Sequence, residues 1–293
     1  MSHTVLSNVD KDGNATVVLN RPDVHNAFDE EMVAALTRTL KTLEADSRVR
    51  AVVLMGHGKS FSAGADINRM RRTAGFTREH NLKDALEGAE MFYTLYTLKK
   101  PTIARVHGAA RGGGVGLVAA CDIAIASRDA TFRLSEVRLG IVPAVISPYV
   151  VAAIGSRKAH RYFLSGEEFD AAEAYRIGLI HDLVEEEELN ATIGRVLAEL
   201  YSGGPQAIVA AKQLIGRVVA SPIDRAMMEN TAQYIADVRA NPEAREGLTA
   251  FLEKRRPAWL ALAPAGEAAP GPARGKRRAR HRPAAGPARK RGT

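Results

Sequence analysis

Short apolar runs rich in β-branched residues alternate with amphipathic stretches through the first half of the chain, and this alternation limits the possible folds most strongly. The runs are ATVVL at 15–19, AVVLM at 51–55, PTIARV at 101–106 and DIAIAS at 122–127. Helical periodicity fills two of the intervals, at roughly 29–44 and 78–98. Strands that alternate with helices are typical of α/β proteins. We therefore expect an α/β fold.

From about residue 156 onward the pattern is helical. Helices are expected at 205–219, 222–239 and 242–255, and each range begins at a proline. Proline suits the first position of a helix because its φ is already helical and its missing N–H would have no partner there. A further helix is expected to open with the acidic run 185–188, which would complement the helix dipole.

The formal net charge of +8 is concentrated at one end of the chain. Residues 265–293 hold nine Lys or Arg and one acid, which leaves 32 basic and 32 acidic residues elsewhere. This segment consists largely of Ala, Pro, Gly and Arg, and we expect it to be disordered. Its cations could bind nucleic acid without specificity, but it has no aromatic residue for base stacking. We do not expect nucleic acid to be the partner of the neutral body.

Several classes of protein are excluded by composition. No window approaches the roughly 18 apolar residues that a membrane helix needs, and the first residues do not resemble a signal peptide, so we expect a cytoplasmic protein without membrane association. The single Cys121 cannot form an internal disulfide, and the eight histidines show no ligand spacing. We expect no metal site.

Two glycine-bearing segments follow expected strands, FSAGADI at 61–67 and HGAARGGGVG at 107–116. Small residues let the backbone approach a ligand, and free N–H groups at a helix start attract anions. Two such loops on neighbouring strands could aim two donors at one oxygen, although tight turns would explain the glycines equally well. Dinucleotide binding is disfavoured, because only about seven helical residues separate Gly114 from the next run.

Two further patterns leave alternatives open. Ser62, His57, His107 and Ser135 lie near the glycine segments, but no G-x-S-x-G motif supports a serine hydrolase. Glu136 stands among apolar residues in FRLSEVRLGIVPA, at 132–144. Such a glutamate is either paired in a structural salt bridge or an acid/base whose pKa is raised by burial.

Six segments resemble the crotonase (enoyl-CoA hydratase/isomerase) family in order and spacing over about residues 5–260. They are FSAGADI, KKPTIARVHGAARGGGVGL, CDIAIAS, ATFRLSEVRLGIVPA, FLSGEEFDAAEAYRIGLIHDLV and AFLEKRRPAW. The resemblance implies a crotonase-like ββα superhelix at 1–200, a C-terminal helical trimerisation region at 201–260 and a basic tail at 261–293. It also implies an acyl-CoA substrate, no separate cofactor, and a homotrimer or dimer of trimers.

The resemblance also assigns residues. The thioester oxygen would lie in an oxyanion hole formed by the N–H groups of Ala65 and Gly113, with Glu136 as acid/base. CoA would lie along the first glycine segment and the residue after it, and would approach two residues that often come from a neighbouring subunit. These residues are Ser62, Ala63, Ala65, Asp66, Ile67 and Asn68, then Phe251 and Lys254. Asn68 stands where the family often has lysine, so a phosphate contact is not assured there.

Gly116 stands where many hydratases carry a second glutamate. Glu136 would then act alone, which suits a hydratase that lacks the second carboxylate and also a Δ3,Δ2-enoyl-CoA isomerase. Asp84, Glu87 and Glu90 are the nearest acidic candidates for a replacement, although each is more simply solvent-facing. Ala144 excludes the family's dehalogenases, which need aspartate at that position.

We expect an enoyl-CoA hydratase, with the isomerase as the alternative and an inactive scaffold as a third hypothesis. The segment LSEVRLGIVPAVISPYV is similar to bacterial hydratases for branched or carboxylated enoyl-CoA, of the methylglutaconyl-CoA and carboxygeranoyl-CoA type. That similarity implies leucine or acyclic terpene breakdown.

Overall fold

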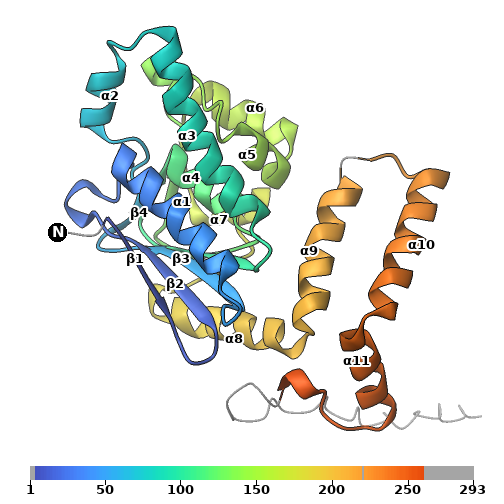
Figure 1. The fold of residues 1–293 in the computed structure, drawn as a ribbon. Coiled ribbons are helices and arrows are strands. Elements are labelled where there is room, and N and C mark those ends of the chain that lie inside the picture. Colours follow the sequence, from blue (N-terminus) through green and yellow to red (C-terminus); the bar gives the residue numbers. More distant parts are fainter. Residues whose placement is uncertain (1–3, 220, 261–293) are drawn as a thin grey trace, which may run out of the picture. The chain divides into compact units, whose positions relative to one another are not determined.

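The computed structural model describes residues 4–219 and 221–260, and its main sheet has six strands in the order β1-β2-β3-β5-β7-β10 (Figure 1). The strands are β1 (Val5–Val9), β2 (Asn14–Leu19), β3 (Ala51–Gly56), β5 (Thr102–Val106), β7 (Ile123–Ser127) and β10 (Asp182–Val184). β1 is antiparallel to β2, and the other neighbouring strands are parallel. The four apolar runs in the sequence correspond to β2, β3, β5 and β7.

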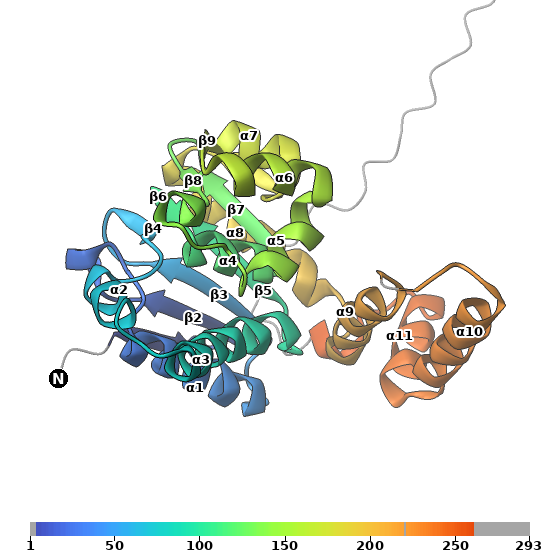
Figure 2. The same ribbon diagram turned by 90° about the horizontal axis from the view of Figure 1, so that it is seen from above.

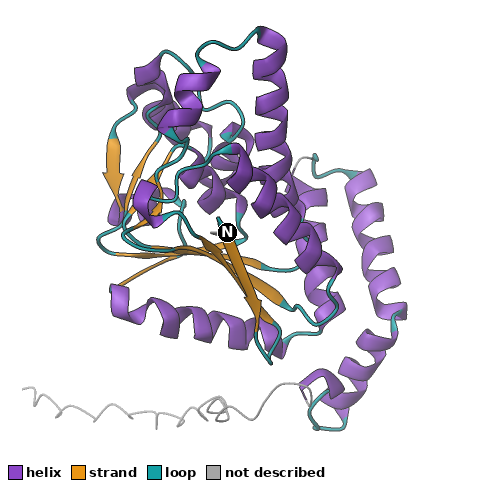
Figure 3. Cartoon of the chain, turned by 60° about the vertical axis from the view of Figure 1, so that its left-hand side comes forward, coloured by secondary structure: helices purple, strands orange, loops and turns teal. Residues whose placement is uncertain are grey.

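A second sheet has four short strands in the order β4-β6-β8-β9 (Figure 3). They are β4 (Ser60–Ser62), β6 (Ala109–Arg111), β8 (Thr131–Arg133) and β9 (Glu168–Asp170), of which only β9 is antiparallel to its neighbour. β3, β5 and β7 are each followed directly by one of these strands. Each turn of the chain thus adds one strand to each sheet. Strands of three residues carry no alternation signal, and sequence analysis missed them.

Helices cover both faces of the main sheet. α1 (Glu30–Ala45), α3 (Arg78–Thr97) and α4 (Gly113–Ala120) pack on one face, and α8 (Leu189–Ser202) packs on the other (Figure 3). Alternate residues of β3 follow this division: Val52 and Leu54 join the larger core, whereas Ala51 and Val53 pack in the α8 layer. Strands buried on both faces form continuous apolar runs, which is why the sequence revealed them.

Shorter elements connect these layers. The helices are α2 (Ile67–Thr73), α5 (Ser147–Ile154), α6 (Ser156–Ser165) and α7 (Ala171–Ile177), and the 3-10 turns are η1 (Pro22–Val24), η2 (Glu136–Leu139), η3 (Glu186–Glu188) and η4 (Ala258–Leu260). The acidic run was expected to open an α-helix. It forms η3 instead, and α8 begins only at Leu189, whose side chain is the first of that helix to enter the core.

Three helices follow α8: α9 (Pro205–Val219), α10 (Arg225–Ala240) and α11 (Pro242–Leu252). Pro205 and Pro242 begin their helices as expected, but Pro222 does not. α10 begins three residues later because the Asp224 carboxylate accepts a hydrogen bond from Met227 N at 2.9 Å and caps it. No residue of α9 or α10 is buried.

The described residues all belong to one compact unit that includes both sheets and α9 to α11. The expected boundary between residues 200 and 201 falls inside α8, which continues to Ser202. The expected basic tail, 261–293, lies outside the described residues, and so do its predicted disorder and nucleic-acid binding. Within the described part of the chain, no helix is long and apolar enough to cross a bilayer.

Candidate functional site

The candidate site lies where three parallel strands of the second sheet end. β4 pairs with β6 and β6 pairs with β8, all in the same direction. Their carboxyl ends therefore share one edge of the sheet, where α/β folds commonly bind ligands. Ala65 follows β4 by three residues, Gly113 follows β6 by two, and Glu136 follows β8 by three. The fold thus brings together Ala65, Gly113 and Glu136, which span 71 positions of the sequence.

The Ala65 N–H is a free donor. Phe28 bridges the residues on either side of it: Phe28 N donates to Gly64 O at 2.6 Å, and Asp66 N donates to Phe28 O at 3.0 Å. These bonds fix the backbone around Ala65 without using its own N–H. Ala65 is exposed, and its N–H has no acceptor within residues 4–219 and 221–260.

The Gly113 N–H is the second free donor. Gly113 is the first residue of α4, so its N–H has no acceptor within the helix, and none elsewhere among the described residues. It lies beside Gly64: a Cβ built on Gly64 would be 3.5 Å from Gly113 N and 2.6 Å from Arg111 O. Gly64 has φ of +80°, so both its conformation and its surroundings require glycine. The two loops therefore approach closely enough for their donors to face one ligand atom.

Glu136 places a carboxylate next to these donors. It begins η2 and is half-buried, and its Oε1 would be 3.0 Å from a Cβ on Gly112, the residue before the second donor. Its Oε2 is buried and has no hydrogen-bond partner in the described part of the chain. Burial raises the pKa of the Glu136 carboxyl, and a hydrogen bond from its own backbone N–H lowers it only in part. Because no cation pairs with it there, the salt-bridge hypothesis is wrong.

A buried asparagine supports the first loop, and sequence analysis missed it. Asn26 is fully buried, and its side-chain nitrogen donates to His57 O at 2.9 Å and Ser60 O at 2.8 Å. Ser62 Oγ donates in turn to Asn26 O at 2.9 Å. Buried polar groups of this kind hold irregular backbone in one conformation. A lone asparagine in a turn carries no sequence signal for such a role.

The residues expected along CoA divide into supporting and exposed groups. Ser62 is buried beneath the loop, Ala63 is half-buried, and Ile67 and Asn68 are exposed at the start of α2. The Asp66 carboxylate caps α2 through Asn68 N at 2.8 Å and pairs with Arg21 at 3.0 Å. Burial alone would raise the pKa of Asp66, but these hydrogen bonds and the guanidinium together lower it. Its side chain is thus committed to the fold.

α2 also carries three arginines with different partners. Arg69 pairs with Asp84 at 2.7 Å and Arg72 pairs with Glu30 at 2.7 Å. Arg71 only donates to the amide oxygen of Asn68, at 3.3 Å, and no described carboxylate neutralises it. A charged group therefore stands beside the position where the family often has lysine, and sequence analysis did not single it out.

Phe251 and Lys254 are not brought to this site within one chain. Phe251 lies near the end of α11 and is 80% exposed, and Lys254 follows the helix with φ of 56°. Figures 1 and 2 both place α11 at the far side of the sheets from α2. Any contact between these residues and a ligand at Ala65 would have to come from another copy of the chain.

Gly116 leaves no room for the absent glutamate. A Cβ at this position would lie 2.3 Å from Ile146 Cγ2 and 3.0 Å from the Phe92 ring. The nearest acidic candidates do not replace it either: Asp84 is bound by Arg69, and Lys41 binds Glu90 at 2.6 Å. Glu87 is exposed on α3. Glu136 is thus the carboxylate that the described residues place beside the free donors.

The serine hydrolase alternative from the sequence finds no support. Ser62 Oγ donates to a carbonyl, while His57 contacts Asn20 and His107 contacts Gly58 O, so none of these histidines activates that serine. No cluster of His, Cys, Asp or Glu among the described residues could hold a metal ion. Cys121 is buried, and burial raises the pKa of its thiol to about 12, which removes it as a nucleophile at neutral pH.

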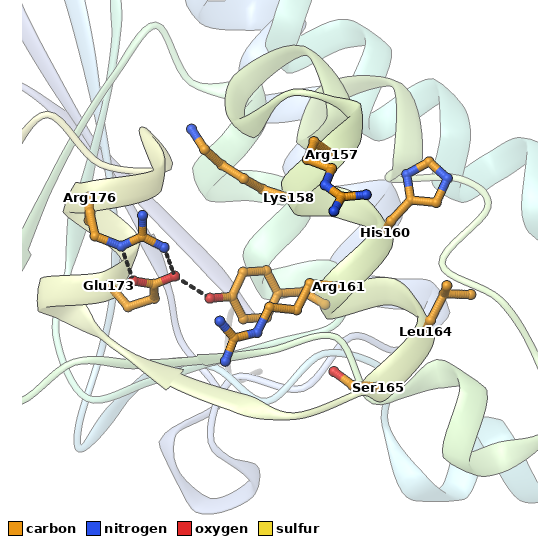
Figure 4. Close-up of a pocket in the computed structure, with 9 residues that line it drawn as sticks. Arg157, Lys158, His160, Arg161, Leu164, Ser165, Glu173 and Arg176 are labelled. Atoms are coloured by element: carbon orange, nitrogen blue, oxygen red, sulfur yellow. Dashed lines mark hydrogen bonds and ion pairs between the residues drawn. The ribbon is translucent and has the colours of Figure 1, made fainter.

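A basic cavity of about 670 Å³ lies elsewhere, between α6 and α7 (Figure 4). Two of its arginines have carboxylate partners: Arg161 pairs with Glu167 at 2.6 Å, and Arg176 pairs with Glu173 at 2.5 Å. The Arg176 hydrogen bond, together with the Tyr162 hydroxyl, lowers the pKa of Glu173 to about 2. These contacts neutralise both of those guanidinium groups within the protein.

Comparison with known proteins decides the family. The model for enoyl-CoA hydratase/isomerase matches residues 10–261. The chain belongs to this family. It is 35% identical over 256 residues to a short-chain-enoyl-CoA hydratase of Clostridium acetobutylicum, covering 86% of this chain and 97% of that one. It is also 33% identical over 264 residues to a 1,2-epoxyphenylacetyl-CoA isomerase of Escherichia coli, covering 88% and 98%.

Solved structures confirm the crotonase-like fold. An enoyl-CoA hydratase from Shewanella pealeana superposes with a TM-score of 0.85 at 42% identity, covering 88% of this chain and 97% of that one. The expected α/β class and the C-terminal helical region agree with this family member. The relatives include both hydratases and an isomerase, so family membership leaves the two reactions to be separated by experiment.

Adding one methyl group at Gly116 should destabilise the protein. We expect Gly116→Ala to cost about 1–3 kcal/mol, because Ile146 and Phe92 already fill the space. Gly194→Ala is the matched control, since Gly194 is also helical and nothing lies within 4 Å of its added Cβ. It should gain up to about 1 kcal/mol. Melting temperatures at equal protein concentration would measure both, and a Gly116→Ala protein as stable as wild type would contradict the close contact.

Proposed function

We propose that the protein is an enoyl-CoA hydratase that adds water across the α,β double bond of an acyl-CoA thioester. The observation that carries the proposal is the convergence of two free N–H groups and one half-buried carboxylate at the edge of the second sheet. Donors fixed in this way stabilise a negative oxygen without reorganising during the reaction. CoA is part of the substrate, and the proposed chemistry needs no further cofactor.

The proposed reaction needs one proton to be taken and one to be returned. With the thioester oxygen at Ala65 and Gly113, the Glu136 carboxylate takes a proton from water while the hydroxide oxygen bonds to the β carbon. The resulting enolate carries its charge on the oxygen held by the two N–H groups. Protonated Glu136 then gives its proton to the α carbon, and the enzyme returns to its starting state. A pKa raised by burial suits both steps.

Isomerisation is the second candidate, because it also needs only one carboxylate. Glu136 would remove a proton from the carbon next to a 3-enoyl double bond and return it at the far end of the enolate. The apolar contact of Ile146 and Phe92 with Gly116 favours this candidate, since no second carboxylate is available there to orient water. The hydratase, unlike the isomerase, requires that Glu136 alone hold and orient a water molecule.

Replacing Glu136 with glutamine tests the acid/base role. Glu136→Gln keeps the shape of the side chain but cannot accept the proton, so we expect turnover to fall by about 10²–10⁴-fold with substrate binding retained. Because burial raises the pKa, the acid limb of the wild-type pH profile should lie above the usual range of glutamate. Glu199→Gln, at an exposed position of α8, is the matched control. Retention of more than about a tenth of wild-type turnover would contradict the role.

The same assay separates the two reactions. Absorbance of the conjugated thioester falls when a 2-enoyl-CoA is hydrated and rises when a 3-enoyl-CoA is isomerised. We expect a fall with crotonyl-CoA or methylglutaconyl-CoA. A rise with the 3-enoyl substrate alone would favour the isomerase, and no change with either would sink both.

The substrate is proposed more finely as a branched or carboxylated enoyl-CoA, of the kind met in leucine or acyclic terpene breakdown. The support is the similarity of LSEVRLGIVPAVISPYV to that group of hydratases. A kcat/KM for methylglutaconyl-CoA below that for crotonyl-CoA would contradict it.

Arg71 is proposed to bind a phosphate of CoA. It stands next to exposed Asn68 and lacks a carboxylate partner in the described residues, unlike Arg69 and Arg72. We expect Arg71→Gln to raise KM about tenfold or more while kcat changes little, because a charged hydrogen bond contributes about 1.5–3 kcal/mol. The short thioester of N-acetylcysteamine, which lacks the nucleotide, should react equally with both proteins. Equal KM values for the CoA substrate would exclude the contact.

We propose that the chain forms a homotrimer or a dimer of trimers. The support is the absence of any buried residue in α9 and α10, although both carry large apolar side chains such as Ile215, Met228 and Ile235. Amphipathic helices of this kind gain most of their stability from covering their apolar face. A partner chain could also bring Phe251 and Lys254 to the CoA site.

Light scattering should give three or six times the 31.5 kDa chain mass. Replacing Leu252, which is 77% exposed on α11, with aspartate should lower that mass, because a charge would then be buried between chains. Leu6→Asp, on the edge strand β1, is the control and should leave the mass unchanged. A monomeric wild-type protein would overturn the proposal.

A further inference from the structure

Three tyrosines gather beside the proposed site, on α3 and α5. Tyr149 lies 5.2 Å from Tyr96, measured between ring centroids. Tyr93 is one turn away from Tyr96 on α3, and the proximity of both phenols contributes, after burial, to raising the pKa of Tyr149. Both helices pack against α4, the helix that begins at Gly113 (Figure 2). We name Tyr93, Tyr96 and Tyr149 the tyrosine cluster.

One aromatic ring separates this cluster from the oxyanion donors. Phe92 lies 3.6 Å from a Cβ built on Gly113 and 3.0 Å from one built on Gly116. The Tyr149 ring lies 6.0 Å from the same Phe92 ring, measured between ring centroids. Phe92 therefore contacts both the start of α4 and the tyrosine cluster.

The phenol hydroxyls of the cluster have no protein acceptor in the described part of the chain, which contrasts with three other tyrosines. Tyr162, Tyr201 and Tyr234 each donate to a protein oxygen. Tyr93 and Tyr96 are 59% and 45% exposed, and Tyr149 is half-buried. An apolar acyl group covering these hydroxyls would remove water from them and offer nothing in return, which costs free energy.

We propose that the tyrosine cluster forms the distal end of the acyl site and donates hydrogen bonds to an oxygen at the far end of the acyl group. This inference rests on the proposed function, because it places the thioester at Ala65 and Gly113. A terminal carboxylate is the preferred acceptor, since hydrogen bonds to a charged oxygen are about twice as strong as neutral ones. Sites built to pair with a polar group reject analogues that lack it.

Calorimetric titration of the full chain with three saturated thioesters tests the inference without requiring turnover. The probes are glutaryl-CoA, 4-oxopentanoyl-CoA and pentanoyl-CoA, which share a five-carbon main chain. The first carries a carboxylate at C5, the second a ketone at C4, and the third no oxygen beyond the thioester. We expect glutaryl-CoA to bind roughly tenfold or more tightly than pentanoyl-CoA, with 4-oxopentanoyl-CoA between them. If the neutral ketone binds as tightly as the carboxylate, the acceptor is an uncharged oxygen and the cluster still holds it.

Phenylalanine variants remove the hydroxyl and keep the ring. Tyr96→Phe and Tyr149→Phe should each weaken glutaryl-CoA binding about threefold or more. Together they should abolish its advantage, while pentanoyl-CoA binding does not weaken, because its apolar end no longer covers unpaired hydroxyls. Tyr175→Phe is the matched control, because Tyr175 is exposed on α7, outside the cluster. Equal affinity of wild type for all three probes, or an equal loss for all probes in the variants, would overturn the inference.

The two proposals fail differently. A protein that hydrates crotonyl-CoA but shows no tyrosine-dependent preference would retain the proposed function and lose the inference. A protein that hydrates no enoyl-CoA but still prefers glutaryl-CoA through Tyr96 and Tyr149 would lose the proposed function and retain the distal site.

Discussion

The close approach of the loops after β4 and β6 is the constraint on which the site depends. At Gly64 the two backbones are so near that a methyl group would overlap Arg111 O, at 2.6 Å. Hydrogen bonds from Phe28 to this loop and the buried Asn26 amide beneath it hold the approach in place. The unpaired N–H groups of Ala65 and Gly113 cost little folding free energy, because neither is enclosed by protein and both remain accessible to a ligand. Parallel pairing of three short strands then adds Glu136 to the same edge.

The chemistry of the site follows from what packs around α4. Ile146 and Phe92 fill the space at Gly116, where the family resemblance implies a carboxylate in many hydratases, so their side chains form an apolar wall there. Phe92 belongs to this wall and also lies beside Gly113. The tyrosine cluster lies next to Phe92 through Tyr149. Restoring the glutamate alone would not restore a two-carboxylate site.

Sequence patterns predicted the long elements well and the short ones poorly. Buried strands such as β3 gave continuous apolar runs because both of their faces are covered, and α1 and α3 gave clear helical periodicity. The three-residue strands of the second sheet, which position the site, were too short to show alternation. The prediction that α10 starts at Pro222 was wrong, because the Asp224 carboxylate caps the helix and fixes its start at Arg225. Site residues came from the family resemblance and not from periodicity.

The sequence by itself determined the α/β class, the main strands and the family, and it predicted Glu136 as the acid/base and Gly116 in place of a second carboxylate. These follow from local patterns and from motifs in a fixed order. Only the tertiary structure decided that no cation within residues 4–219 and 221–260 pairs with Glu136, that no carboxylate in the same ranges neutralises Arg71, and that three tyrosines meet next to Phe92. Such facts depend on which side chains from distant segments are in contact, because partners and burial arise from packing and no single stretch of chain encodes them.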